Sequence, residues 1–143
     1  MRLRIVFLLL ASLTACAPAG EWTDDPKNFA RAWGTPCPAG VVVLHSWYWR
    51  SRHFTREEVL FFQFGASAHF RDQFIQSNAF VPVDPARVSS SGYCRATPSW
   101  FLPGPPSRYR AWSVQPSPTP EGSPPFIAED LSTGVLFVYA CQI

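Results

Sequence analysis

The sequence predicts one small α+β domain, built on an antiparallel sheet of four or five strands with one main helix and long proline-rich loops. The 143 residues suffice for a single domain, since domains usually have about 100 to 200 residues. Hydrophobic residues make up 47% of the chain and charged residues 15%, which is too apolar for a disordered protein. The 15 prolines favour loops and extended segments over a helical bundle, because proline breaks helix interiors.

The first two strands are predicted from apolar runs in the first half of the chain. Val41–Leu44 is β-branched and apolar, follows a turn-forming segment at 34–40, and predicts a strand that continues toward Trp49. Residues 55–58 have the spacing of a helix capping box, but the β-branched and aromatic run at 59–64 favours a strand. We prefer the strand.

The main helix is predicted directly after this second strand. Ser67 can cap its beginning, and Phe70, Phe74 and Ile75 fall on one face with polar residues opposite them. Asn78 is typical of a helix end.

The C-terminal half predicts loops followed by a hairpin. Residues 79–83 are short and extended, with a proline that excludes a central strand, and 84–106 is mainly loop. A strand is predicted at 109–114, and the proline-rich segment 116–125 predicts an extended surface loop. Two apolar runs, 126–128 and 135–139, predict a terminal hairpin that turns at Gly134.

Residues 1–15 have the organisation of a signal peptide: two arginines, an apolar stretch and a small-residue cleavage site. The apolar stretch is too short to span a membrane, which takes about 20 residues in a helix. The four residues Leu13-Thr14-Ala15-Cys16 resemble the lipobox of bacterial lipoproteins, a resemblance that covers the targeting segment alone.

This resemblance implies cleavage between Ala15 and Cys16, a diacylglycerol on the Cys16 thiol, and a fatty acid such as palmitate on the Cys16 amine. Two or three acyl chains would hold the mature protein at a membrane surface. Ala17 would permit sorting to the outer membrane in a Gram-negative host. We therefore expect an exported lipoprotein of the cell envelope or periplasm, with a signal peptide at 1–15, a lipidated tether and short packed turn at 16–33, and one domain at 34–143.

The charge balance argues against nucleic acid as a partner. The whole chain has 12 basic and 10 acidic residues, and removal of Arg2 and Arg4 with the signal peptide leaves 10 of each. A neutral mature domain lacks the basic face that nucleic acid requires.

Three cysteines remain in an oxidising compartment once Cys16 is lipidated: Cys37, Cys94 and Cys141. They predict one disulfide and one free thiol, and all three pairings stay open. No C-x-x-C sequence indicates a zinc or thioredoxin-like site.

The sequence offers no convincing set of catalytic or metal-binding residues. Ser67 lacks the second glycine of a nucleophile elbow, so we interpret it as a helix cap. The three histidines, at 45, 53 and 69, are spaced eight and sixteen apart and place no two ligands on one helix turn. Adjacent Glu57 and Glu58 would point to opposite faces of a strand. We expect no metal and no cofactor.

One segment, 46–54, interleaves aromatic residues with cations. In a strand, Trp47, Trp49 and Ser51 would face one side while Tyr48, Arg50 and Arg52 face the other. These residue types dominate binding hot spots, but such tryptophans can equally fill a core beneath solvated arginines. Residues 100–103 carry the same ambiguity. The candidate partner surface consists of Trp47, Trp49, Arg50, Arg52 and His53.

Three functions remain open from the sequence. The first is a non-enzymatic binding or accessory module, anchored to the membrane, that holds or inhibits an envelope protein. The second is a small envelope enzyme that acts on peptidoglycan or another glycan through a cysteine or histidine. The third is a structural protein of the envelope that docks through its proline-rich loop.

Overall fold

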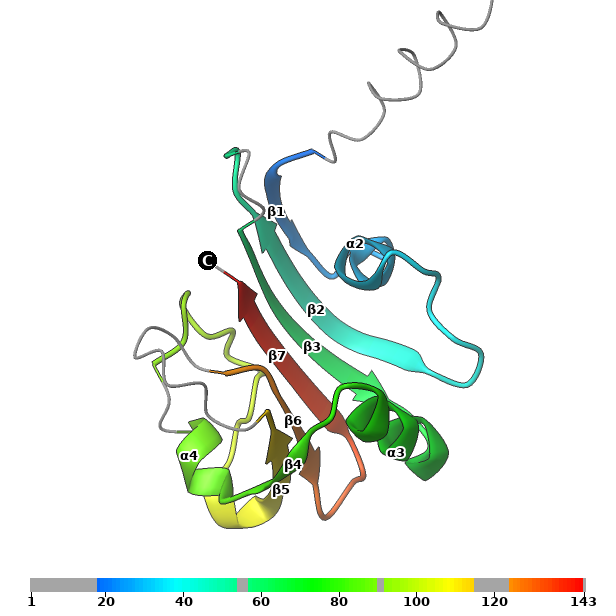
Figure 1. The fold of residues 1–143 in the computed structure, drawn as a ribbon, viewed down its shortest axis with the longest axis vertical. Helices are drawn as coiled ribbons and strands as arrows, with labels where there is room; N and C mark the ends of the chain where they lie inside the picture. Colours follow the sequence, from blue (N-terminus) through cyan, green and yellow to red (C-terminus); the bar gives the residue numbers. More distant parts are fainter. Residues whose placement is uncertain (1–17, 54–56, 90–91, 115–123, 143) are drawn as a thin grey trace, which may run out of the picture.

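A single antiparallel sheet of seven strands organises the domain, as the computed structural model shows for residues 18–53, 57–89, 92–114 and 124–142 (Figure 1). The strand order is β1-β2-β3-β7-β6-β5-β4. The strands are β1 (Gly20–Thr23), β2 (Val42–Arg50), β3 (Glu58–Gly65), β4 (Val81–Val83), β5 (Tyr109–Ser113), β6 (Phe126–Asp130) and β7 (Leu136–Gln142). The helices are α2 (Asn28–Trp33), α3 (Ala68–Ser77), α4 (Pro85–Ser89) and the 3-10 turn η2 (Pro106–Arg108).

The predicted fold of four or five strands with one main helix is wrong. The sheet has seven strands, and the described residues contain three α-helices. Two of the strands, β1 and β4, are short edge strands of four and three residues. Strands this short carry little sequence signal of their own, and each is defined by its pairing with the neighbouring strand, β2 or β5. β1 lies in the segment expected to be a tether, and it pairs with β2 from Gly20–Arg50 to Thr23–Trp47.

The strands and the helix predicted from long apolar patterns are confirmed. The structure places β2, β3, β5 and the β6–β7 hairpin where the sequence predicted strands, and Gly134 turns the hairpin with a φ of 71°. Ser67 caps α3 by accepting a hydrogen bond from the Phe70 amide, with N and Oγ 3.2 Å apart, and Asn78 ends the helix.

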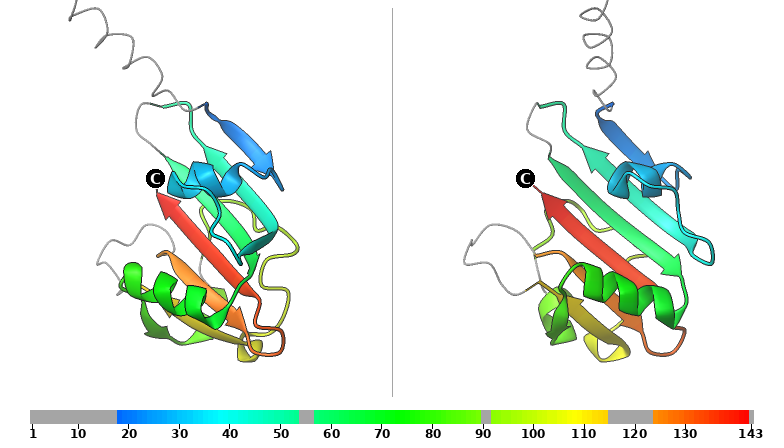
Figure 2. Two further views of the ribbon diagram at one scale, coloured as in Figure 1. Left: turned by 90° about the vertical axis from the view of Figure 1, so that its right-hand side faces the viewer. Right: turned by 45° about the vertical axis from the view of Figure 1, so that its right-hand side comes forward.

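Both faces of the sheet are buried, which explains the nearly continuous apolar run of β3. Phe61 and Phe62 are neighbours in β3, point to opposite faces, and are both fully buried. We call the side covered by α2 and α3 the helical face (Figure 2). We call the other side, covered by α4 and the segment 92–105, the loop face.

On the loop face, 92–105 forms a packed layer and not a free surface loop. Phe101 packs edge-on against Phe61, with ring centroids 4.9 Å apart. A disulfide joins Cys94 to Cys141 of β7, and the Cys94 amide donates to the Tyr139 hydroxyl at 3.0 Å. Cys37 is free and exposed. The predicted disulfide is therefore present, with this one of the three pairings.

The N-terminal part of the described chain is tied to the sheet by a buried asparagine. The Asn28 side-chain amide donates to the Trp22 carbonyl and to the Ser46 hydroxyl, both at 3.0 Å, which joins α2 to β1 and β2. Within the residues the structure describes, no helix is both long and apolar enough to cross a membrane. The lipobox, with Ala15 and Cys16, lies outside the described residues.

Candidate functional site

A row of aromatic side chains follows β2 on the loop face. His45, Trp47 and Trp49 occupy alternate positions of the strand, and Trp100 joins them from the 92–105 segment. All four side chains are half-buried. We call these four residues the aromatic strip. The predicted alternation holds, because Tyr48 between the two tryptophans is buried on the helical face.

Each ring at the two ends of the strip is held by a partner from another segment. The His45 ring stacks on Trp100, with centroids 5.3 Å apart and planes 20° apart. Nδ1 of His45 lies 3.3 Å from an Asp24 carboxylate oxygen, and the other Asp24 oxygen accepts from the Ser46 amide at 2.8 Å. At the opposite end, the Arg95 guanidinium lies over Trp49, 3.9 Å from the ring centroid.

Trp47, in the middle of the strip, combines an apolar and a polar contact. Its ring packs edge-on against Phe61, with centroids 5.8 Å apart. Its indole Nε1 donates to the Glu21 carboxylate at 2.8 Å. The strip therefore combines ring contacts at all four residues with hydrogen bonds at His45 and Trp47.

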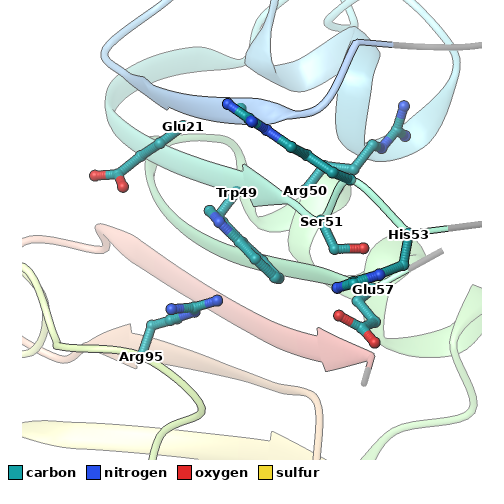
Figure 3. Close-up of a pocket in the computed structure, with 9 residues that line it drawn as sticks. Glu21, Trp49, Arg50, Ser51, His53, Glu57 and Arg95 are labelled. Carbon is teal, nitrogen blue, oxygen red and sulfur yellow. The ribbon is translucent and has the colours of Figure 1, made fainter. Parts of the chain in front are cut away.

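An open pocket of about 560 Å³ adjoins the Trp49 end of the strip (Figure 3). It lies where β1 begins, β2 ends and β3 approaches, and we call it the turn pocket. Its lining consists of Gly20, Glu21, Trp49, Arg50, Ser51, Arg52, His53, Glu57 and Arg95. Figure 3 shows Arg95 facing Trp49 on one side of the pocket, while His53 and Glu57 lie at the turn after β2.

Arg50 does not supply a free cation to this pocket. Its guanidinium Nε donates to the Glu58 carboxylate at 2.9 Å, and the two side chains are 12% and 10% exposed. The register of β2 and β3 places these residues directly opposite each other. Two further guanidinium groups of the pocket, on Arg52 and Arg95, belong to exposed residues.

The structure divides the predicted partner surface into two parts. Trp47 and Trp49 belong to the aromatic strip, whereas Arg52 and His53 lie exposed at the turn beyond β2. The sequence did not predict that Glu21, Asp24 and Arg95 would join them. These contacts cross from β1 and the 92–105 segment, and the sequence carries no local signal for them.

The arrangement of the remaining candidates favours structural roles. Ser67 caps α3, and Glu58 is paired with Arg50. Across the described ranges, no three or more histidine, cysteine or acidic side chains gather in a way that could hold a metal ion. Asp24 orients the His45 imidazole as a general base requires. Within the part of the chain that the structure describes, the other ring nitrogen, Nε2 of His45, makes no hydrogen bond to a nucleophilic side chain.

No known protein family, curated protein or solved structure matches this chain.

Proposed function

We propose that this protein is a lipid-anchored, non-enzymatic binding or accessory module of the bacterial cell envelope. It holds an envelope protein through the aromatic strip, and it inhibits that partner where the strip covers a functional surface. The observation that carries the proposal is the strip: two tryptophans and a histidine of β2 with Trp100 of the 92–105 segment beside them on the loop face, each partly open to solvent. Tryptophan and arginine are the residue types that dominate binding hot spots.

The contacts around the strip support binding because they hold the rings before a partner arrives. Asp24 and Trp100 fix His45, Glu21 fixes Trp47, and Arg95 covers one face of Trp49. Side chains that are already ordered lose less conformational entropy on association. Indole rings also add large apolar area with few rotatable bonds.

The state of the free thiol supports a binding role over cysteine-dependent catalysis. Desolvation raises the pKa of the Cys37 thiol above its usual value, whereas a nucleophilic cysteine needs a lowered one. Cys94 and Cys141 are joined in the disulfide. A small envelope enzyme acting on a glycan remains the second candidate, and the Asp24–His45 pair is the observation that favours it.

The anchor is tested by the chemistry of Cys16. Mass spectrometry of the mature protein should show cleavage before Cys16 and a diacylglycerol-bearing N-terminal residue. A Cys16→Ser chain should not incorporate labelled palmitate. An unmodified N-terminus at another residue would contradict the anchor.

The binding role is tested by cross-linking and capture of the intact lipoprotein from its own membranes. A stoichiometric partner should be retained by the wild type and weakened about 30-fold by Trp47→Ala or Trp100→Ala, the effect of losing one hot-spot side chain worth about 2 kcal/mol. Leu131→Ala is the matched control, because Leu131 is an exposed apolar residue, 60% accessible, that lies outside the strip. Equal capture by all variants would contradict the proposal, and glycan hydrolysis assays of His45→Ala would then be decisive for the enzyme alternative.

A further inference from the structure

We propose that the aromatic strip binds a protein resident in the same membrane that holds the lipid anchor, where the surface of that protein meets the lipid headgroups. The inference rests on the anchored binding module proposed above and identifies the class of its partner. Three observations carry it: the length of chain between Cys16 and β1, the register of β1 against β2, and the contacts that keep β1 in place.

The chain between the lipidated residue and the sheet is short. Gly20 begins β1 and follows Cys16 by four residues. An extended chain covers at most about 3.6 Å per residue, so the two Cα atoms lie within about 14 Å of each other. An acylated Cys16 sits at the membrane surface, because its acyl chains are buried in the hydrocarbon core. The start of β1 therefore stays close to the headgroups.

The strand register extends this limit to the strip. Glu21 pairs with Trp49, and Thr23 pairs with Trp47. Paired Cα atoms of antiparallel strands are at most about 5.5 Å apart, so the Cα atom of Trp49 lies within about 24 Å of that of Cys16, and the Cα atom of Trp47 within about 31 Å. Figure 1 shows the start of β1 and the end of β2 at the same end of the sheet. Both tryptophans of β2 thus lie in the half of the strand nearer the anchor.

The limit holds because side-chain and backbone contacts keep β1 on the sheet. The Asn28 side-chain amide donates to the Trp22 carbonyl and to the Ser46 hydroxyl, which joins β1, α2 and β2. The Asp24 backbone amide donates to the Ser46 carbonyl at 2.7 Å. Loosening of β1 would lengthen the tether, but it would break these buried and partly buried hydrogen bonds together.

A partner that covers the tryptophans of β2 must itself extend to the headgroups. A protein–protein interface of standard size buries about 800 Å² on each partner, the area of a circle with a radius of about 16 Å. Centred on Trp49, such a patch reaches to within about 8 Å of Cys16 even when the tether is fully extended. The headgroup layer of one leaflet is itself about 6 Å thick. A membrane-resident protein already has its surface at this height, whereas a soluble protein would have to displace hydrated headgroups.

The composition of the strip indicates what the partner presents at this height. The half-buried indole rings require apolar side chains at the centre of the partner's surface. Glu21, Asp24 and Arg95 are exposed around the rings and require a polar rim. Two proteins held in one membrane also meet at a raised effective concentration, so a narrow strip suffices for their association.

The first test maps which end of β2 the partner covers. A photoreactive benzoylphenylalanine replaces Arg52, exposed at the turn beyond β2, or Val42, which is 58% exposed at the other end of the strand. Val42 is eight residues from Arg50, or about 27 Å at the rise of an antiparallel strand. In intact cells we expect one protein to be cross-linked from position 52, in at least the yield obtained from position 42. Adducts from position 42 alone would overturn the proposal.

The second test asks where the cross-linked protein resides when this chain is absent. In cells that lack the lipoprotein, we expect that protein to stay with the membranes through washes with high salt and with alkaline carbonate. Its recovery in the soluble fraction of those cells would overturn the proposal.

The third test lengthens the tether. Twenty glycine and serine residues inserted after Pro18 enlarge the volume that the strip explores, so the yield of adducts from position 52 should fall about tenfold in cells with low expression. The same twenty residues added at the C-terminal end of the chain are the matched control and should leave the yield unchanged. An undiminished yield with the long tether would overturn the proposal.

These outcomes are separable from those of the proposed function. Mass spectrometry of Cys16 reports on the anchor, and Trp47→Ala reports on the strip. A soluble protein whose capture is lost in Trp47→Ala would support the binding module and overturn the membrane-resident partner alone. Absence of any strip-dependent partner would overturn both.

Discussion

The disulfide between Cys94 and Cys141 should account for a large share of the stability of this domain. The two cysteines are 47 residues apart, so the cross-link removes a long loop from the freedom of the unfolded chain. The chain-entropy relation gives about 4 kcal/mol for a loop of this length at 25 °C. Against a typical unfolding free energy of about 5 to 15 kcal/mol, this contribution changes the ratio of folded to unfolded protein by roughly three orders of magnitude.

The measurement is urea unfolding, followed by circular dichroism, of the oxidised protein and of Cys94→Ala/Cys141→Ala. Both proteins should carry Cys37→Ser, because Cys37 is exposed and its thiol could exchange with the disulfide. We expect the double variant to lose about 4 kcal/mol, and reduction of the parent protein to give the same loss. A loss below about 1 kcal/mol would refute the reasoning, since it would show that the unfolded chain gains little freedom when the cross-link is absent.

Three further predictions concern the core and the titrating groups. Phe62→Ala, at a fully buried position, should lower the free energy of unfolding by about 3 to 5 kcal/mol in urea titrations, whereas Val42→Ala, at a position 58% exposed, should change it by less than about 0.5 kcal/mol. Arg108 donates a hydrogen bond to Asp130, with Nε and Oδ2 2.8 Å apart, and this holds the pKa of the Asp130 carboxyl well below its usual range. The contribution of this carboxylate to stability is therefore present above about pH 4 and is lost as the pH falls below that value. Asp130→Asn should flatten the loss of stability in unfolding titrations from pH 5 to 2, and an unchanged slope would contradict this prediction. Burial raises the pKa of Tyr48 to about 12, so the folded protein holds the phenol proton more tightly than the unfolded chain does. Stability therefore falls as the pH rises above about 10. Tyr48→Phe should reduce this alkaline loss of stability in thermal melts, and the same loss in both proteins would count against the prediction.

Local sequence patterns predicted the elements that carry their own signal. The aromatic run of β3 and the alternation of β2 are strong enough to indicate strands, and Ser67 and Asn78 mark the two ends of α3. β1 is different, because its four residues, Gly-Glu-Trp-Thr, include small and polar residues and show no run that predicts a strand. They form a strand by pairing with the longer β2. The number of strands was therefore underestimated at the edge of the sheet.

The candidate site, like the fold, could be predicted only where a local sequence pattern indicates it. The alternation of β2 places Trp47 and Trp49 on one face, which the sequence indicated. Arg50 forms an ion pair with Glu58 because the length of the β2–β3 turn sets a register in which the two residues lie opposite each other. Arg95 reaches Trp49 from 46 positions away, and the disulfide at the neighbouring Cys94 fixes its segment to β7. Contacts of this range follow from the tertiary fold.

The two edges of the sheet differ in their capacity to recruit another chain. β4 has three residues, and Pro82 has no amide hydrogen, so this edge presents too few donors for a further strand to add. β1, at the other edge, has four residues without proline. Two copies could pair through β1, but among the residues that the structure describes this is the one receptive edge of each copy. Edge-to-edge association of this domain would therefore stop at a dimer, and crowding on a surface would not extend it into fibres.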